Sequence, residues 1–284
     1  MTAGCASQEW PTSMSPLDRA RRWLAAHHQV LVLPVLLLAF AMRLWRIAAK
    51  DLWWDEGASV WQAPMSLTEI ALYQARDQHP PLYYWSLHYW HDWFGSSLFA
   101  LRLLSAGWGT LGVAVAYTLG KRVLRSGFRS HAGAFFLAIS RFHIEWSQEV
   151  KMYAMATTLA MLWLLVAALA LRDPDLQDQR RGQKGRNWQR WCLWLGYWAM
   201  GVVSIYSHYT ALLVFASQNL YAMWILVGLH RNKKPLRGLL ARWGVAQVAV
   251  LFAAVPWFML HSRHTWVWPA SPARPLGEVV RMVA

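Results

Sequence analysis

The sequence predicts an all-α polytopic membrane protein, and three features of its composition support this class. Of the 284 residues, 56% are apolar and only 15% are charged, whereas about 25% of the residues in a typical soluble domain are charged. The apolar residues form blocks that are too long for ordinary core helices, and 21 tryptophans accompany them. The only cysteines, Cys5 and Cys192, exclude a disulfide scaffold.

The N-terminal third predicts a tail, a first span and a long outer loop. Residues 1–28 are polar with a basic end, which is typical of a cytoplasmic tail, and residues 29–260 form the membrane module. Its first span covers residues 30–47, and the next segment, residues 49–96, is aromatic and too broken to cross the bilayer. Within it, residues 80–94 predict an interfacial helix, because fifteen helical residues extend about 22 Å and the hydrocarbon core measures about 30 Å.

Six further apolar blocks raise the expected number of spans to seven: 98–119, 132–148, 152–171, 191–207, 210–228 and 243–260. Basic clusters follow the first, third and fifth of these blocks, and Lys and Arg collect in cytoplasmic loops. The net charge of +14 therefore indicates topology rather than nucleic acid binding. With seven spans and the basic clusters in the cytoplasm, four stretches are predicted to lie outside it: 49–96, 147–151, 206–210 and the Pro-rich segment 261–284.

Two groups of polar residues in the first outer loop suit chemistry. Asp55 and Glu56 are adjacent acids just past a span, where carboxylates can act as a general base or bind a cation. His79 precedes Pro80-Pro81 at the start of the predicted interfacial helix, and a helix N-terminus beside an imidazole can hold an anion. The alternatives are a solvated acid pair and simple turn chemistry.

A third group interrupts two apolar blocks. Glu149 and Lys151 lie at membrane depth, where ionisable groups are costly and usually face a cavity or each other. An ion pair without a substrate role is the alternative. Arg102 and Arg141 lie inside apolar blocks, and a buried Arg needs an anionic partner, either a lipid phosphate or one of these acids.

The remaining residues predicted to lie outside the cytoplasm, 206–209 and 261–264, include histidines and Arg263. The pairs His88/His91 and His261/His264 have no Cys or carboxylate pattern that would define a metal site. An acid pair can act with or without a divalent cation, so the sequence leaves the metal requirement open. It contains no Gly-rich phosphate loop and no nucleophile elbow, so nucleotide hydrolysis at a P-loop is unsupported.

Four motifs in consistent order resemble the dolichyl-phosphate-mannose–protein mannosyltransferase-like proteins, which are polytopic glycosyltransferases of family 39 in the GT-C superfamily. The resemblance runs from about residue 40 to 265 and rests on Arg43-Leu-Trp-Arg with Leu52-Trp-Trp-Asp-Glu-Gly57, His79-Pro-Pro-Leu-Tyr-Tyr84, Leu101-Arg-Leu-Leu-Ser105 and Ser147-Gln-Glu-Val-Lys-Met-Tyr153.

The resemblance implies a GT-C module in the cell membrane with its active site facing outside the cytoplasm. A sugar would pass from a polyprenyl-phosphate donor to an unidentified hydroxyl acceptor, with inversion. Asp55 would be the catalytic base beside Glu56. The residues expected to bind substrate are His79, Tyr83, Arg102, Glu149, Lys151, Tyr153, His208 and Arg263.

The chain departs from the family pattern at two positions. Lys151 stands where the family commonly has Arg, and Arg141 stands where it commonly has Pro. Lys keeps the charge but lacks the two-pronged guanidinium that grips a phosphate. Family members are longer, so we expect this chain to be the N-terminal portion of a larger protein. Two other functions stay open: a transporter or flippase of a lipid-linked anion, and an inactive scaffold.

Overall fold

All regular structure in the described residues of the computed structural model is helical, which confirms the all-α class. The described residues are 15–16, 30–77, 79–171, 187–233 and 236–264. Three predicted segments lie wholly or mostly outside them: the N-terminal tail, the basic cluster that follows residue 171, and the segment from residue 265.

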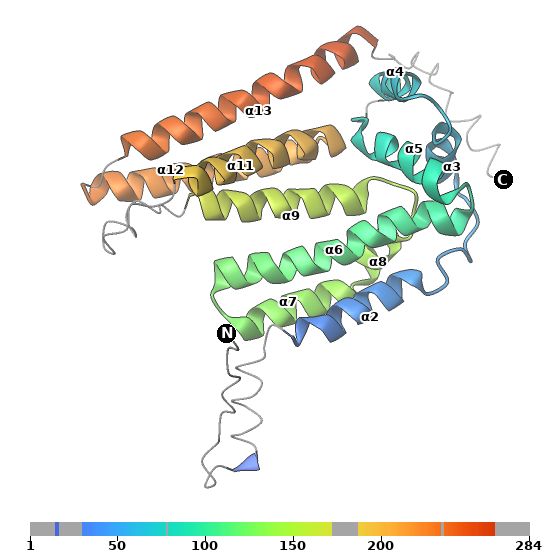
Figure 1. The fold of residues 1–284 in the computed structure, drawn as a ribbon, viewed down its shortest axis with the longest axis horizontal. Coiled ribbons are helices and arrows are strands. Elements are labelled where there is room, and N and C mark those ends of the chain that lie inside the picture. Colours follow the sequence, from blue (N-terminus) through green and yellow to red (C-terminus); the bar gives the residue numbers. More distant parts are fainter. Residues whose placement is uncertain (1–14, 17–29, 78, 172–186, 234–235, 265–284) are drawn as a thin grey trace, which may run out of the picture.

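Seven helices run side by side along the molecule (Figure 1): α2 (Val32–Leu44), α6 (Leu98–Leu124), α7 (Gly127–Ile139), α9 (Tyr153–Ala170), α11 (Asn187–Ser207), α12 (Ala211–Arg231) and α13 (Arg237–His264). Shorter helices gather at one end of this bundle: α3 (Trp54–Gln62), α4 (Leu67–Asp77), α5 (Leu82–Phe94) and α8 (Arg141–Ser147). The helix predicted for residues 80–94 is thus present as α5, which begins directly after Pro80-Pro81. Its interfacial placement stays a prediction.

Four helices in the described part of the chain are long and apolar enough to cross a membrane, namely α6, α9, α12 and α13. The fold is therefore compatible with a membrane protein. Helix α2 is apolar but has only 13 residues, which extend about 20 Å, less than the hydrocarbon core. The full count of seven spans stays a prediction.

The bounds of one predicted span are wrong, because residues 132–148 do not form a continuous helix. Helix α7 ends at Ile139, and Ser140 has an extended conformation with ψ 115°. The Ser140 hydroxyl then accepts a hydrogen bond from the backbone N–H of His143 and starts α8. Arg141 consequently lies outside the bundle, 90% exposed, and its Nε donates to Glu145 at 2.9 Å rather than to a buried anion.

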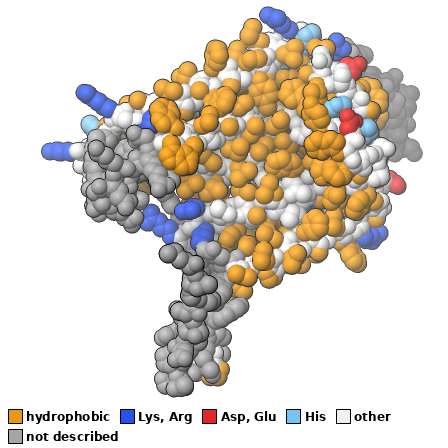
Figure 2. Space-filling view, in the orientation of Figure 1, with side chains coloured by type: hydrophobic (Ala, Val, Ile, Leu, Met, Phe, Trp, Pro, Cys, Tyr) orange, Lys and Arg blue, Asp and Glu red, His pale blue; other side chains and the backbone are white. Residues whose placement is uncertain are grey.

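The two ends of the bundle differ in charge. Figure 2 shows an apolar belt between one end rich in Lys and Arg and another end where the visible Asp and Glu side chains lie with His. All eight acidic residues of the described part lie between residues 51 and 149, in the α3–α5 end, α8 and the turn after it. The four stretches predicted to share one side thus meet at the same end of the bundle, as far as the structure describes them (Figure 1).

Candidate functional site

The candidate site lies at the acidic end of the bundle, where the first turn of α3 meets α6 and the turn before α9. Asp55 and Glu56 are consecutive residues of α3. Consecutive helical side chains point about 100° apart, so the two carboxylates face different surroundings. The buried residues of α3 are Glu56, Ser59 and Gln62, spaced three apart, and Asp55 lies off this face.

Glu56 and Arg102 form the buried pair. Arg102 donates from Nε to Oε1 at 2.7 Å and from Nη2 to Oε2 at 2.6 Å, which is the two-pronged geometry of a strong ion pair. The Glu56 side chain is fully buried and that of Arg102 is 2% exposed. The backbone N–H of Val150 also donates to Glu56 Oε1 at 2.9 Å. The anionic partner that the sequence required for Arg102 is therefore this acid.

The buried pair holds three segments together. Arg102 Nη1 donates to the carbonyls of Ile47 at 2.8 Å and Lys50 at 2.9 Å, so α6 is tied to the loop that follows α2. Glu56 adds the start of α3 and, through Val150, the turn before α9. Because both side chains are closed off by these contacts, they position the site rather than offer groups to a substrate.

Asp55 and Lys151 form the half-exposed pair, with Lys151 Nζ 2.9 Å from Asp55 Oδ1. The Asp55 side chain is 41% exposed, whereas that of Lys151 is 3% exposed. The structure thus confirms that the acids near residue 55 and the turn near residue 150 meet. It also gives Lys151 a different partner from Glu149, the neighbour considered from the sequence.

Tyr83 supports the backbone of Lys151 through Ser105 and does not line an open site. The Ser105 hydroxyl donates to the Lys151 carbonyl at 3.2 Å and lies 2.9 Å from the Tyr83 hydroxyl. Since Ser105 has a single O–H, which it gives to Lys151, Tyr83 is the donor of the second bond. Tyr83 is fully buried, so its role here is to fix the turn.

Aromatic and imidazole rings form the rim beside the half-exposed pair. The ring of His208 lies 5.9 Å from that of Tyr153 and 6.5 Å from that of His79, between centroids. His79 Nδ1 is 3.5 Å from Asp77 Oδ2. Burial, and then the neighbouring His79, lowers the pKa of His208, so this imidazole is neutral at neutral pH.

Two predicted residues stand apart from this group. Glu149 lies in the same turn as Lys151, but its Oε2 is shielded from solvent and accepts no hydrogen bond within the described part of the chain. Burial, and then the charge of Glu56, raises the Glu149 pKa. Arg263 is exposed in the last turn of α13, and no hydrogen bond or ion pair of the described residues links it to Asp55.

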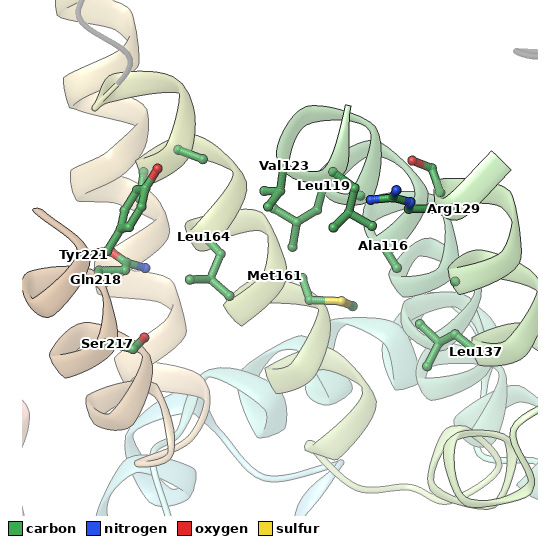
Figure 3. Close-up of a pocket in the computed structure, with 16 residues that line it drawn as sticks. Ala116, Leu119, Val123, Arg129, Leu137, Met161, Leu164, Ser217, Gln218 and Tyr221 are labelled. Carbon is green, nitrogen blue, oxygen red and sulfur yellow. The ribbon is translucent and has the colours of Figure 1, made fainter. Parts of the chain in front are cut away.

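Two adjoining cavities lie along the bundle, and the first begins at these rings. The first, about 560 Å³, is lined by Tyr153 and His208 together with Leu137, Ser140, Phe142, His143, Trp146, Ala154, Ala156, Thr157 and Thr210. The second, about 620 Å³, lies deeper between α6, α7, α9 and α12 and shares Leu137 with the first. Figure 3 shows this deeper cavity, with Gln218 and Tyr221 of α12 across from Leu119 and Val123 of α6.

Three residues of the site were absent from the predicted set. Tyr84 is buried close to Asp55, whose charge contributes to raising the Tyr84 pKa after burial and Asp77. Asp77 pairs with His79, and the ring of Trp146 packs 4.5 Å from that of Tyr153. The His-Pro-Pro-Leu-Tyr-Tyr motif contained a signal for Tyr84, whereas nothing in the spacing pointed to Trp146.

Among the residues that the structure describes, no group of three or more His, Cys, Asp or Glu side chains converges to hold a metal ion. The site therefore places the accessible carboxylate of Asp55 against the buried ammonium of Lys151, with the His208 imidazole and a largely apolar cavity beside Tyr153. Comparison of the sequence with protein-family models and with curated proteins found no match in either.

Proposed function

We propose that the chain is a membrane glycosyltransferase that moves a sugar from a polyprenyl-phosphate donor to a hydroxyl acceptor outside the cytoplasm. The observation that carries this proposal is the half-exposed pair, in which an accessible carboxylate and a buried ammonium lie 2.9 Å apart, with Lys151 two residues before Tyr153, which lines a largely apolar cavity. A lipid-phosphate sugar needs a base for the acceptor, a cation for the phosphate and an apolar path for the tail.

In the proposed mechanism, Asp55 accepts the proton of the acceptor hydroxyl as its oxygen attacks the anomeric carbon. The bond from that carbon to the phosphate oxygen breaks, and the lipid phosphate leaves with the electron pair. Attack opposite the leaving group inverts the anomeric centre. A phosphate is already a good leaving group, so the site needs no general acid.

Lys151 is the group that stabilises the developing charge on the phosphate, because its ammonium is buried and preoriented. His208 lies at the same rim and, as a neutral imidazole, donates a hydrogen bond without adding charge. The lipid tail follows the cavity past Tyr153 and Leu137 into the deeper cavity. The buried pair of Glu56 and Arg102 holds these groups in register.

The decisive experiment compares the wild type with Asp55→Asn, which keeps the shape and removes the base. The purified chain is incubated with a labelled polyprenyl-phosphate sugar and a hydroxyl acceptor, and release of polyprenyl phosphate is measured. We expect a loss of about 10²- to 10⁴-fold, the usual contribution of a general base. Asp51→Asn, an exposed carboxylate of the same loop, is the matched control and should keep the wild-type rate.

Transfer at the wild-type rate by the Asp55 variant would disprove this assignment. A transporter of a lipid-linked anion is the second candidate, because the two adjoining cavities lead from the acidic end toward Arg129 at the basic end. Passage of the labelled lipid across proteoliposomes without cleavage of its sugar–phosphate bond would favour that function.

A further inference from the structure

A third cavity lies at the basic end of the bundle, far from the candidate site. It measures about 900 Å³ and is lined by α2, α6 and the start of α7. Its lining is Val32, Leu36, Ala114, Tyr117, Thr118, Lys121, Arg122, Arg125, Ser126 and Gly127. Neither the proposed reaction nor the motifs of the sequence use this cavity.

The charge of the lining favours an anion. Three cations, Lys121, Arg122 and Arg125, line the cavity, and its lining contains no acid. The N-terminus of α7, with its 13 residues, opens onto the same space, because Ser126 and Gly127 are part of the wall. The first N–H groups of a helix have no acceptors within it and carry a partial positive charge, which adds to the attraction for an anion.

The backbone at Arg125 adds an independent observation. Arg125 follows α6 with φ 52°, in the left-handed region that favours glycine. A charged side chain thus occupies a position where glycine would relieve strain. Strain of this kind is a reason to look for a function of the side chain.

The apolar part of the wall identifies the kind of anion. Val32 is the first residue of α2, Leu36 lies one turn deeper, and Ala114 lies about two turns from Lys121 along α6. A free phosphate would leave these apolar surfaces without a binding partner. A phospholipid presents a phosphate to the cations and an acyl chain to the apolar residues.

We propose that this cavity binds the headgroup of an anionic phospholipid of the membrane leaflet at the basic end. The lipid phosphate lies between Lys121, Arg125 and the start of α7, and an acyl chain runs along Val32 and Leu36. Basic pockets between membrane helices are a common setting for such lipids. The site is separate from the proposed transfer reaction, so it can be tested independently of it.

The test uses the full chain in nanodiscs of phosphatidylcholine mixed with an equal amount of phosphatidylglycerol. Native mass spectrometry then measures which lipid stays bound after mild release. Each Lys or Arg near an anionic surface contributes a factor of about five to binding. We therefore expect the double variant Lys121→Gln with Arg125→Gly to lower the preference for phosphatidylglycerol by about 25-fold.

The matched control is Arg231→Gln with Arg237→Gln, which removes two exposed cations at the same end that do not line the cavity. It should keep the wild-type preference. Arg125→Gly alone guards against misfolding, because glycine suits this backbone, and it should lower the preference by about fivefold. The proposal is wrong if both double variants behave alike, or if inorganic phosphate displaces the lipid.

Discussion

The two ion pairs of the candidate site begin at neighbouring residues and differ in their surroundings. Glu56 is fully buried, is held by two bonds from Arg102 and accepts a third from Val150. Asp55 is 41% exposed and meets one buried ammonium, that of Lys151. A carboxylate therefore holds segments of the fold together in one pair and is an accessible group in the other.

This difference has a physical origin in desolvation. Taking two charges out of water is costly, and the buried pair offsets that cost only through its complete set of bonds. Such a pair is difficult to break and unavailable to a substrate. The half-exposed pair keeps contact with solvent at Asp55, so a substrate can reach this carboxylate while Lys151 stays oriented by the turn.

The largest expected effect comes from breaking the buried pair. Arg102→Met leaves the Glu56 carboxylate buried without its partner, and such changes cost about 3–5 kcal/mol of stability. Thermal unfolding in detergent, followed by tryptophan fluorescence, measures the loss. Arg141→Met removes a cation from the exposed pair with Glu145 and should change stability by less than about 0.5 kcal/mol. Equal effects of the two variants would contradict the distinction between the pairs.

A smaller effect is expected from the half-exposed pair, and on the proposed transfer rather than on the fold. Lys151→Met removes the cation for the leaving phosphate and should lower kcat by about 10²- to 10³-fold. Lys151→Arg keeps the charge and should retain most of the activity. Single-turnover release of polyprenyl phosphate checks both variants. If Met and Arg at this position gave the same rate, Lys151 would have no electrostatic role.

The smallest effect concerns Glu149, whose pKa is raised first by burial and then by Glu56. A carboxyl with a raised pKa in the folded state favours folding while it is protonated, and this contribution is lost as pH rises through the folded pKa. Glu149→Gln should therefore be more stable than the wild type at pH 7, by less than about 1 kcal/mol since the side chain is partly exposed. The difference should vanish below pH 4, and melting temperatures at both pH values measure it.

Several features of the fold follow from the sequence without the structure. The apolar blocks predicted a helical chain, and four of the helices have the length and composition of spans. Pro80-Pro81 predicted the start of α5, because proline suits a first helical turn. The position of Asp55 and Lys151 in stretches assigned to one side predicted that they would be neighbours, and their atoms lie 2.9 Å apart.

Other features could not be read from local pattern. The break between α7 and α8 at Ser140 could not be predicted from the apolar residues around it. A single serine can cap a helix or continue one, and only the packing of the chain determines which of the two occurs. The same limit applied to Arg141, which turned out to be exposed. The partner of Arg102 depended on a contact across 46 positions of the chain, which periodicity does not reveal.

The sequence alone thus determined the class of the molecule, the segregation of its charges and the stretches that carry the candidate site, because these depend on composition and on spacing along the chain. Only the tertiary structure decided which of two adjacent acids is buried. Side chains at consecutive helical positions diverge by about 100°. The packing of α3 against α6 and the turn before α9 turns Glu56 inward and leaves Asp55 at the surface.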